Sequence, residues 1–174
     1  MKTNLIILRH AEFDKSPDMN TYPGPGLNQT GRLQSDILAA YLSSKPINHI
    51  FTSDFTRCIE TGIPLSALKR IKMAHVIALR ERDPEQETHQ SLNDRVKKWF
   101  VHEKNILLKS DTLIISHCGP INMLLDEIHN NELPINYTYT DKYLCHTPKS
   151  GIWIFECSNG KILTYQMIFN LTSL

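Results

Sequence analysis

Short apolar runs that alternate with helical patterns are the feature that most constrains how this chain can fold. The runs at residues 4–8, 49–52 and 112–116 have the composition of buried strands. Each is followed, directly or after a loop, by apolar residues at helical spacing. Strands that alternate with helices pair in parallel, and the helices cover both faces of the sheet. The sequence therefore predicts an α/β protein, a three-layer α/β/α sandwich with a mainly parallel central sheet.

Turn-forming residues divide the rest of the chain. Ser158-Asn159-Gly160 separates two strand-like segments and is typical of a hairpin, so antiparallel pairing is expected at an edge of the sheet. Ser53 or Asp54 can cap the second helix. The predicted strands are 4–8, 49–52, 73–79, 112–116, 151–155 and 162–169; the predicted helices run from 28 to Pro46, from 54 to Pro64, from 92 to 108 and from 119 to 128; the predicted irregular segments are 16–27, 81–88 and 130–147.

Length and composition favour one globular catalytic domain over residues 1–174. The chain is 41% hydrophobic and 21% charged, which is enough apolar material for a core and too little charge for extensive disorder. A net charge of +1 predicts no bulk attraction to nucleic acid or to an anionic membrane. No apolar run approaches the roughly 20 residues that span a bilayer. We expect a cytoplasmic protein, and nothing in the sequence indicates its oligomeric state.

The four cysteines are scattered along the chain and form no Cys-x-x-Cys pair. This spacing favours neither a zinc site nor a disulfide framework, so reduced thiols are the simpler expectation. Cys118 stands beside His117, but it needs a neighbour that lowers its pKa before it can act as a nucleophile. The cysteines are Cys58, Cys118, Cys145 and Cys157.

Basic side chains follow the predicted strands at the edge where open α/β sheets bind their ligands. Arg9 and His10 come directly after the first strand. Arg57 lies in the first turns of the helix after the second strand, and His117 follows the fourth. Because the guanidinium fork matches two phosphate oxygens, these residues together predict a phosphoryl pocket. Taken singly, Arg9 also suits an ion pair at the sheet edge, and Arg57 suits an exposed helix surface.

A phosphoryl-transfer site needs a nucleophile, and the chain contains no Gly-x-Ser-x-Gly elbow. A neutral imidazole can itself take the phosphoryl group near pH 7, and His10 has the position for this role. His117 can hydrogen-bond the transferring oxygens and counter their developing charge. For either histidine the alternative is a hydrogen-bonded residue of the core or rim.

The leaving alkoxide needs a proton. Glu81 follows the strand predicted at 73–79, so it can lie at the same edge of the sheet and act as the general acid. Asp83, Glu85 and Glu87 are close enough in sequence to compete for this role. The alternative is that this stretch forms only a solvated charged loop.

Several blocks in this order resemble the signatures of the histidine phosphatase superfamily, the phosphoglycerate mutase-like proteins. Each block alone is common, whereas their joint occurrence from residue 4 to about 125 is specific. The blocks are Leu8-Arg9-His10-Ala11-Glu12, Leu27-Asn28-Gln29-Thr30-Gly31-Arg32-Leu33-Gln34, Ser53-Asp54-Phe55-Thr56-Arg57-Cys58-Ile59-Glu60-Thr61, Leu79-Arg80-Glu81 and Ser116-His117-Cys118-Gly119.

The resemblance implies a phosphoglycerate mutase-like fold and a phosphatase, a hydrolase that works through a phosphohistidine intermediate. It implies that the chemistry needs no metal and no cofactor, and that the partner is a small phosphorylated substrate rather than a phosphoprotein. The implied nucleophile is His10, the implied proton donor is Glu81, the implied phosphate-binding residues are Arg9, Arg57 and His117, and Ser16 is a further phosphate-binding candidate from the loop after the first strand.

Other activities of the same family stay open at this point. A mutase must shield its phosphoenzyme from water, and this compact chain has no obvious lid beyond residues 14–27 and 129–147, so a phosphatase is favoured. A protein phosphohistidine phosphatase needs a proton donor less, because imidazole is a good leaving group. A non-catalytic phosphate-binding protein is less expected, since both arginines and both histidines are present.

The chain departs from the family pattern at three places. Ala11 replaces the usual glycine and adds a methyl group near the phosphate site. Cys118 replaces a residue that is commonly glycine, which affects the expected width of the pocket. The acidic segment 82–87 lacks the family's Gly-x-x-Glu-Gly continuation, so the assignment of Glu81 as the acid depends on the structure.

Overall fold

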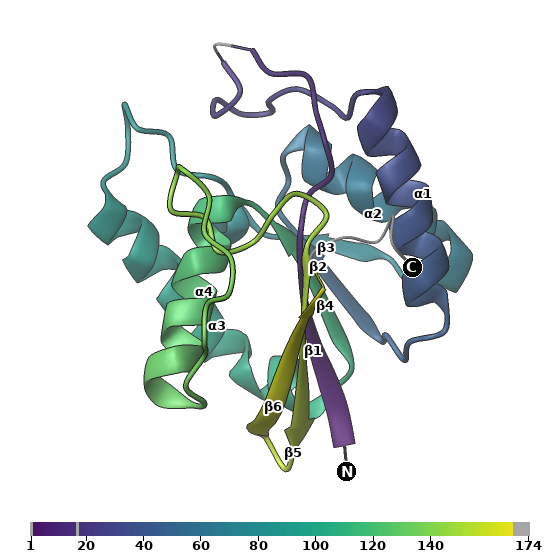
Figure 1. Ribbon diagram of the computed structural model, residues 1–174, viewed down its shortest axis with the longest axis vertical. Helices are drawn as coiled ribbons and strands as arrows, with labels where there is room; N and C mark the ends of the chain where they lie inside the picture. Colours follow the sequence, from purple (N-terminus) through teal and green to yellow (C-terminus); the bar gives the residue numbers. More distant parts are fainter. Residues whose placement is uncertain (1, 17, 169–174) are drawn as a thin grey trace.

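In the computed structural model, which describes residues 2–16 and 18–168, a six-stranded sheet lies between two pairs of helices (Figure 1). The strands are arranged in the order β3-β2-β4-β1-β5-β6, so β1 and β4 are neighbours inside the sheet. The strands are β1 (Lys2–Arg9), β2 (His49–Thr52), β3 (Met73–His75), β4 (Thr112–Ser116), β5 (Ile152–Ser158) and β6 (Lys161–Ile168).

Strand pairing is parallel from β3 through β2 and β4 to β1, and antiparallel for β5 and β6. At the centre, Ile6 pairs with Leu113 of β4 on one side and with Ile154 of β5 on the other. Asn159 and Gly160 have φ angles of 52° and 75° and turn β5 into β6, as expected for residues that tolerate the left-handed region. The predicted α/β sandwich with antiparallel edge pairing is confirmed.

Two helices cover each face of the sheet. In Figure 1, α1 and α2 lie on one side and α3 and α4 on the other. Successive side chains of a strand point to opposite faces: Leu5 and Ile7 pack among residues of α3 and α4, whereas Ile6 and Leu8 pack among residues of α1 and α2. The helices are α1 (Gln29–Ser43), α2 (Thr56–Lys69), the short 3-10 helix η1 (Ile77–Leu79), α3 (His89–Lys109) and α4 (Cys118–Asn131).

Helix α2 continues past Pro64 to Lys69, so the predicted helix end at Pro64 was wrong. A proline inside a helix has no N–H for the carbonyl four residues earlier, which here belongs to Glu60. The hydroxyl of Ser35 in α1 donates to that oxygen at 3.2 Å, and it donates to the Thr61 carbonyl oxygen at 2.9 Å. A side chain of the neighbouring helix thus replaces the missing backbone bond.

The strand predicted for residues 73–79 ends at His75, so its second half was wrong. The chain turns into η1, which closes when the Leu79 amide donates to the Val76 carbonyl oxygen at 3.0 Å. This turn buries Leu79, whose carbonyl oxygen accepts a hydrogen bond of 2.8 Å from the Ser116 hydroxyl. The segment after η1 is thereby directed to the carboxyl end of β4.

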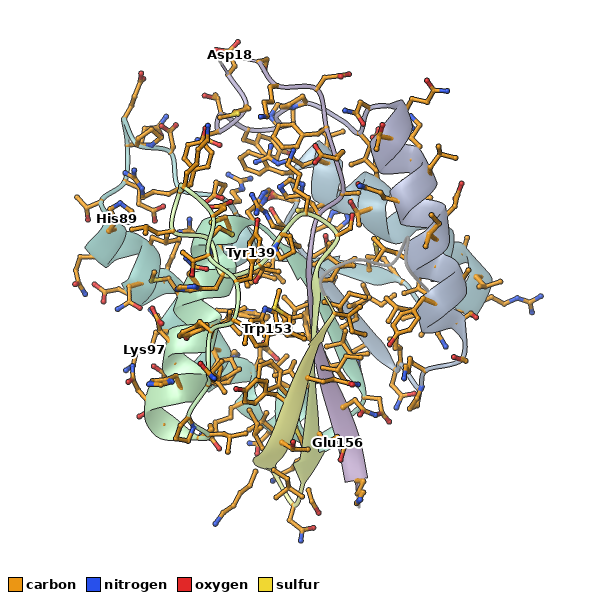
Figure 2. The ribbon with its side chains drawn as sticks, viewed as in Figure 1. Asp18, His89, Lys97, Tyr139, Trp153 and Glu156 are labelled. Atoms are coloured by element: carbon orange, nitrogen blue, oxygen red, sulfur yellow. The ribbon has the colours of Figure 1, made fainter. Side chains whose placement is uncertain are left out.

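Two long segments lie outside the helices and strands: residues 10–16 and 18–28 lie at the carboxyl end of the parallel strands, and residues 132–151 run from the far end of α4 up to the same side (Figure 1). Pro17 of the first segment lies outside the described residues. Asp18 of this segment and Glu156 of β5 are at opposite ends of the molecule (Figure 2). The carboxyl end of the sheet is therefore the side that these loops cover.

The last predicted strand, 162–169, corresponds to β6, except that Phe169 lies outside the described residues. Within residues 2–16 and 18–168, none of the helices combines the length and the apolar character that crossing a lipid bilayer requires.

Candidate active site

His10 lies directly after β1 and is 3% exposed. Its amide donates to the Ser116 carbonyl oxygen at 2.9 Å, which fixes the backbone against the end of β4. Its Nδ1 lies 2.8 Å from the carbonyl oxygen of Ala11. Because a carbonyl oxygen only accepts, Nδ1 carries the proton of the neutral ring, and Nε2 keeps its lone pair. Nε2 is thus the nitrogen available as a nucleophile.

The surroundings of His10 keep its ring neutral. Burial is the largest influence, followed by the positive charges of Arg57 and Arg9, and together they hold the pKa of His10 well below its ordinary value of 6.5. Lys149 acts in the same direction. An imidazole is nucleophilic only when unprotonated, so His10 has the required form at neutral pH.

His117 follows β4, and its ring lies edge-on to that of His10 with the ring centroids 5.1 Å apart. Its Nε2 is 2.9 Å from Ser53 Oγ and 3.4 Å from Cys58 Sγ. The side chain is fully buried, and burial, followed by the charge of Arg57, holds the pKa of His117 well below its ordinary value. The two histidines singled out from the sequence therefore meet as neutral rings.

The Arg9 side chain is held by the segment between α4 and β5. Its Nη1 donates to the Thr147 carbonyl oxygen at 2.7 Å and lies 3.2 Å from Cys145 Sγ. Asp141 Oδ2 is 3.8 Å from the same nitrogen. Arg9 therefore also makes an ion pair, which the sequence analysis gave as the alternative to phosphate binding. The Nε of Arg9 is buried and has no hydrogen-bond partner among the described residues.

Arg57 in the first turn of α2 is 1% exposed, so it is not the exposed helix residue of the alternative interpretation. Its Nη1 donates to the Met19 carbonyl oxygen at 2.7 Å. The guanidinium lies 4.8 Å from the ring centroids of both Phe13 and Phe55, and these rings fix its plane. Within the described residues, its buried Nε also lacks a partner.

Glu81 lies against the N-terminus of α4. Its Oε2 accepts from the Gly119 amide at 3.3 Å, and its Oε1 accepts from the Arg82 amide at 3.0 Å. A methyl group on Gly119 would overlap Oε1, so the glycine admits the carboxylate here. The predicted acid is thus held at the backbone of Gly119, two residues after the second histidine in the chain.

The competing acids of the same loop are engaged elsewhere. Glu87 forms two hydrogen bonds with Arg95, of 2.6 and 2.8 Å. Asp83 Oδ1 accepts from the amide of Glu85, whose side chain is exposed. In the described part of the chain, no group of three His, Cys, Asp or Glu side chains lies close enough to hold a metal ion.

Ser16 is connected to the cluster only through the backbone of a turn. Its carbonyl oxygen accepts from the Met19 amide at 3.2 Å, and the Met19 carbonyl oxygen in turn binds Arg57. The described residues give the Ser16 hydroxyl no hydrogen bond. The structure thus joins five of the six candidate residues and leaves the Ser16 side chain apart.

The role of Ser53 was missed in the sequence. It was expected as a helix cap, but α2 is preceded by Phe55 as N-cap, and Ser53 instead contacts His117. The Ser53 hydroxyl accepts from the Phe55 amide at 3.3 Å, which leaves its proton for the histidine ring. Ser53 stands four residues before Arg57 in the same sequence block, and this spacing was the signal that could have identified it.

Lys149 was missed because nothing in its sequence neighbourhood marks it. Its Nζ lies 4.4 Å from the Phe13 ring centroid and pairs with Glu12, which places a third cation near His10. Ala11, where the family has glycine, is not among the described residues with positive φ, and its amide donates to Thr61 Oγ1 at 3.0 Å. The backbone there accepts alanine without strain.

Comparison with protein families matches residues 5–86 to the histidine phosphatase superfamily, branch 1. The matched segment contains Arg9, His10, Arg57 and Glu81. This match confirms the resemblance to the histidine phosphatase superfamily that was drawn from the motifs.

Similar proteins agree with this family. A Schizosaccharomyces pombe protein named as a probable phosphatase is 33% identical over 81 residues, which is 45% of this chain and 39% of that protein. Phosphoserine phosphatase 1 of Hydrogenobacter thermophilus is 21% identical over 182 residues, 94% of this chain and 86% of that protein. The phosphoglycerate mutase of Bacillus anthracis superposes with a TM-score of 0.70 at 12% identity over 98% of this chain and 94% of that one, so the two share a fold.

Proposed function

We propose that the chain is a metal-independent phosphomonoesterase that works through a phosphohistidine on His10. The observation that carries this proposal is the pair of buried Nε–H groups of Arg9 and Arg57 that lack partners within the described residues. Each unpaired buried donor costs about 1–3 kcal/mol. The oxygens of a phosphoryl group would accept from both, next to an imidazole whose charge state suits attack.

In the first step, His10 Nε2 attacks phosphorus, and the bond from phosphorus to the leaving oxygen breaks. Arg9, Arg57 and His117 stabilise the charge on the transferring oxygens. Glu81 gives its proton to the leaving alkoxide. The bond from Nδ1 to the Ala11 carbonyl oxygen keeps the ring oriented throughout and stabilises the positive ring of the phosphohistidine.

In the second step, water attacks the phosphohistidine. The Glu81 carboxylate takes a proton from this water, the phosphorus–nitrogen bond breaks, and phosphate leaves. His10 returns to the neutral form that its burial favours. The cycle needs no metal charge because two guanidinium groups balance the phosphoryl dianion.

The superfamily and the phosphatase names of the relatives support phosphatase or mutase-like activity. We infer hydrolysis of small phosphomonoesters, because one relative of nearly full length is named for phosphoserine. The place of Glu81 beside the α4 N-terminus favours alkoxide leaving groups over a histidine leaving group, which needs a proton donor less. The proposal takes residues 1–174 as one catalytic domain that works in the cytoplasm.

The test is turnover of aryl phosphates in the presence of a metal chelator. His10→Ala should abolish turnover, whereas the matched control His49→Ala, an exposed histidine of β2, should not. Rapid quenching in base should trap a phosphorylated His10 peptide in the wild type. Activity that survives in His10→Ala, or activity that disappears with the chelator, would contradict the proposal. Turnover of phosphohistidine peptides alone would favour the protein phosphohistidine phosphatase.

A further inference from the structure

Tyr22 lies in a loop that is fixed to α2 on both sides of this residue. The Pro23 carbonyl oxygen accepts a hydrogen bond of 3.0 Å from the Thr56 amide and one of 3.2 Å from the Thr56 hydroxyl. The Met19 carbonyl oxygen, three residues before Tyr22, accepts from Arg57 at 2.7 Å. Thr56 and Arg57 are the first two residues of α2. The backbone around Tyr22 is therefore held against the helix that carries one of the two site arginines.

The ring of Tyr22 is oriented by two contacts. The Arg80 guanidinium lies 4.2 Å from the ring centroid, and two hydrogen bonds of 2.7 and 2.5 Å fix this guanidinium to the Asp54 carboxylate. The Phe55 ring meets the Tyr22 ring edge-on, with the centroids 6.0 Å apart. Despite these contacts, 54% of Tyr22 is exposed to solvent. A flat ring that is fixed in place and open to solvent is well suited to stack against a second ring.

The two neighbours of Tyr22 also connect it to the residues of the proposed reaction. The Phe55 ring lies edge-on to the His117 ring, with the centroids 5.1 Å apart, so Phe55 contacts both His117 and Tyr22. Arg80 directly precedes Glu81, the proposed acid. In the proposed reaction the leaving oxygen receives its proton from Glu81. The leaving group therefore lies on the side of the site that Tyr22 borders.

We propose that Tyr22 selects the substrate by stacking against a flat aromatic ring of the leaving group. The inference rests on the proposed phosphatase function and names its substrate class, phosphomonoesters whose alcohol carries such a ring. Arg80 and Asp54 neutralise each other, so this side of the site offers the leaving group an aromatic surface rather than a net charge. The ring can belong to an aryl alcohol or to a nucleoside, since both present a flat face to the tyrosine.

Binding of phosphonates tests Tyr22 without turnover, because their phosphorus–carbon bond resists hydrolysis. Benzylphosphonate and ethylphosphonate share one head group and differ only in a phenyl ring against a methyl group. We expect the wild type to bind benzylphosphonate about tenfold more tightly in calorimetry, the scale of one aromatic pair. Tyr22→Phe should keep this preference. Tyr22→Leu, which keeps apolar bulk and lacks the ring, should bring the two affinities within about twofold of each other. The control Tyr41→Leu, near the C-terminal end of α1, should match the wild type.

Turnover then identifies the source of the ring. Ethyl and benzyl phosphate have similar alkoxide leaving groups and differ in a phenyl ring; ribose 5-phosphate and adenosine 5′-monophosphate release the same sugar oxygen and differ in the base. A higher kcat/KM for benzyl phosphate indicates an aryl alcohol, and a higher kcat/KM for adenosine 5′-monophosphate indicates a nucleoside.

Tyr22→Leu should remove either preference and leave the two ring-free esters nearly unchanged. Equal kcat/KM values within both pairs in the wild type, or a preference that survives in Tyr22→Leu, would overturn the proposal. A wild type that hydrolyses none of the four esters and still prefers benzylphosphonate would contradict the proposed phosphatase activity, and Tyr22 would remain a ring-binding residue.

Discussion

The imidazole rings of His10 and His117 lie edge to face, with their centroids 5.1 Å apart, at the ends of adjacent strands. The register of β1 and β4 creates this relationship, because Arg9 pairs with Ser116 and the residue that follows each of these strand ends is a histidine. A parallel pair brings the carboxyl ends of its strands to the same edge. Two residues far apart in the sequence thereby face one another in a shared buried environment.

The neutral state of these histidines predicts a loss of stability in mild acid. The pKa of His10 is depressed in the folded protein, so between that value and the unfolded value near 6.5 the unfolded chain binds more protons. The contribution of the neutral histidines to the free energy of unfolding is therefore complete above about pH 6.5, and it decreases as the pH falls below that value. We expect His10 and His117 each to lower the free energy of unfolding by about 1 kcal/mol for every pH unit below 6.5, as measured by urea unfolding. A slope that does not decrease in His10→Gln would contradict this origin.

Ser53 predicts a positioning effect on His117. Ser53→Ala removes the hydroxyl that lies 2.9 Å from His117 Nε2, so the ring loses the hydrogen bond that fixes its orientation. We expect kcat for an aryl phosphate to fall about tenfold, the scale of a small misplacement of a reacting group. Ser43→Ala is the control, since its exposed hydroxyl bonds only within α1. Steady-state kinetics check both variants. Equal activities of Ser53→Ala and Ser43→Ala would show that Ser53 does not position His117.

Gly119 offers a test of Glu81, the proposed acid, without altering that residue. Gly119→Ala would push its new methyl group into Glu81 Oε1 and displace the carboxylate. General acid catalysis contributes about 10²–10⁴-fold and matters most for poor leaving groups. We expect kcat/KM to fall strongly for alkyl phosphates and little for nitrophenyl phosphate, as in Glu81→Gln. A decrease in kcat/KM that is the same for all leaving groups would show that Gly119→Ala does not act through proton donation by Glu81.

The bond between Ser35 and Glu60 predicts a coupling between two helices. Ser35→Ala leaves the Glu60 carbonyl oxygen without its donor, at an expected loss of about 1–3 kcal/mol in the free energy of unfolding. The amide that Pro64→Ala restores can donate to the same oxygen. Ser35→Ala should therefore cost less in the Pro64→Ala background, which a double-mutant cycle in urea measures. Strict additivity would contradict the compensation.

The sheet and most of the candidate site could be predicted from the sequence because both depend on strand ends. Arg9, His10 and His117 directly follow apolar runs, and parallel pairing then brings them to one edge. The position of Arg57 was predictable because this residue lies in the first turn of α2, the helix that follows β2. In a parallel sheet, residues that follow the strands lie at the same edge, so a local sequence pattern is enough to predict that they come together.

What the sequence did not reveal depends on contacts between distant segments. The continuation of α2 past Pro64 rests on Ser35 of another helix, and no local propensity records that contact. The early end of β3 follows from the burial of Leu79 beneath α3. Lys149 reaches the site only because its segment folds back over β1, as the bond from the Ser150 amide to the His10 carbonyl oxygen shows.

Strand β4 sits between β1 and β2 in the sheet, although it comes after both of them in the chain. A growing polypeptide on the ribosome can therefore expose the segments with both arginines well before the strand that must separate and align them has been made. The segments that carry Arg9 and Arg57 can take up their places in one sheet only when β4 pairs with both β1 and β2.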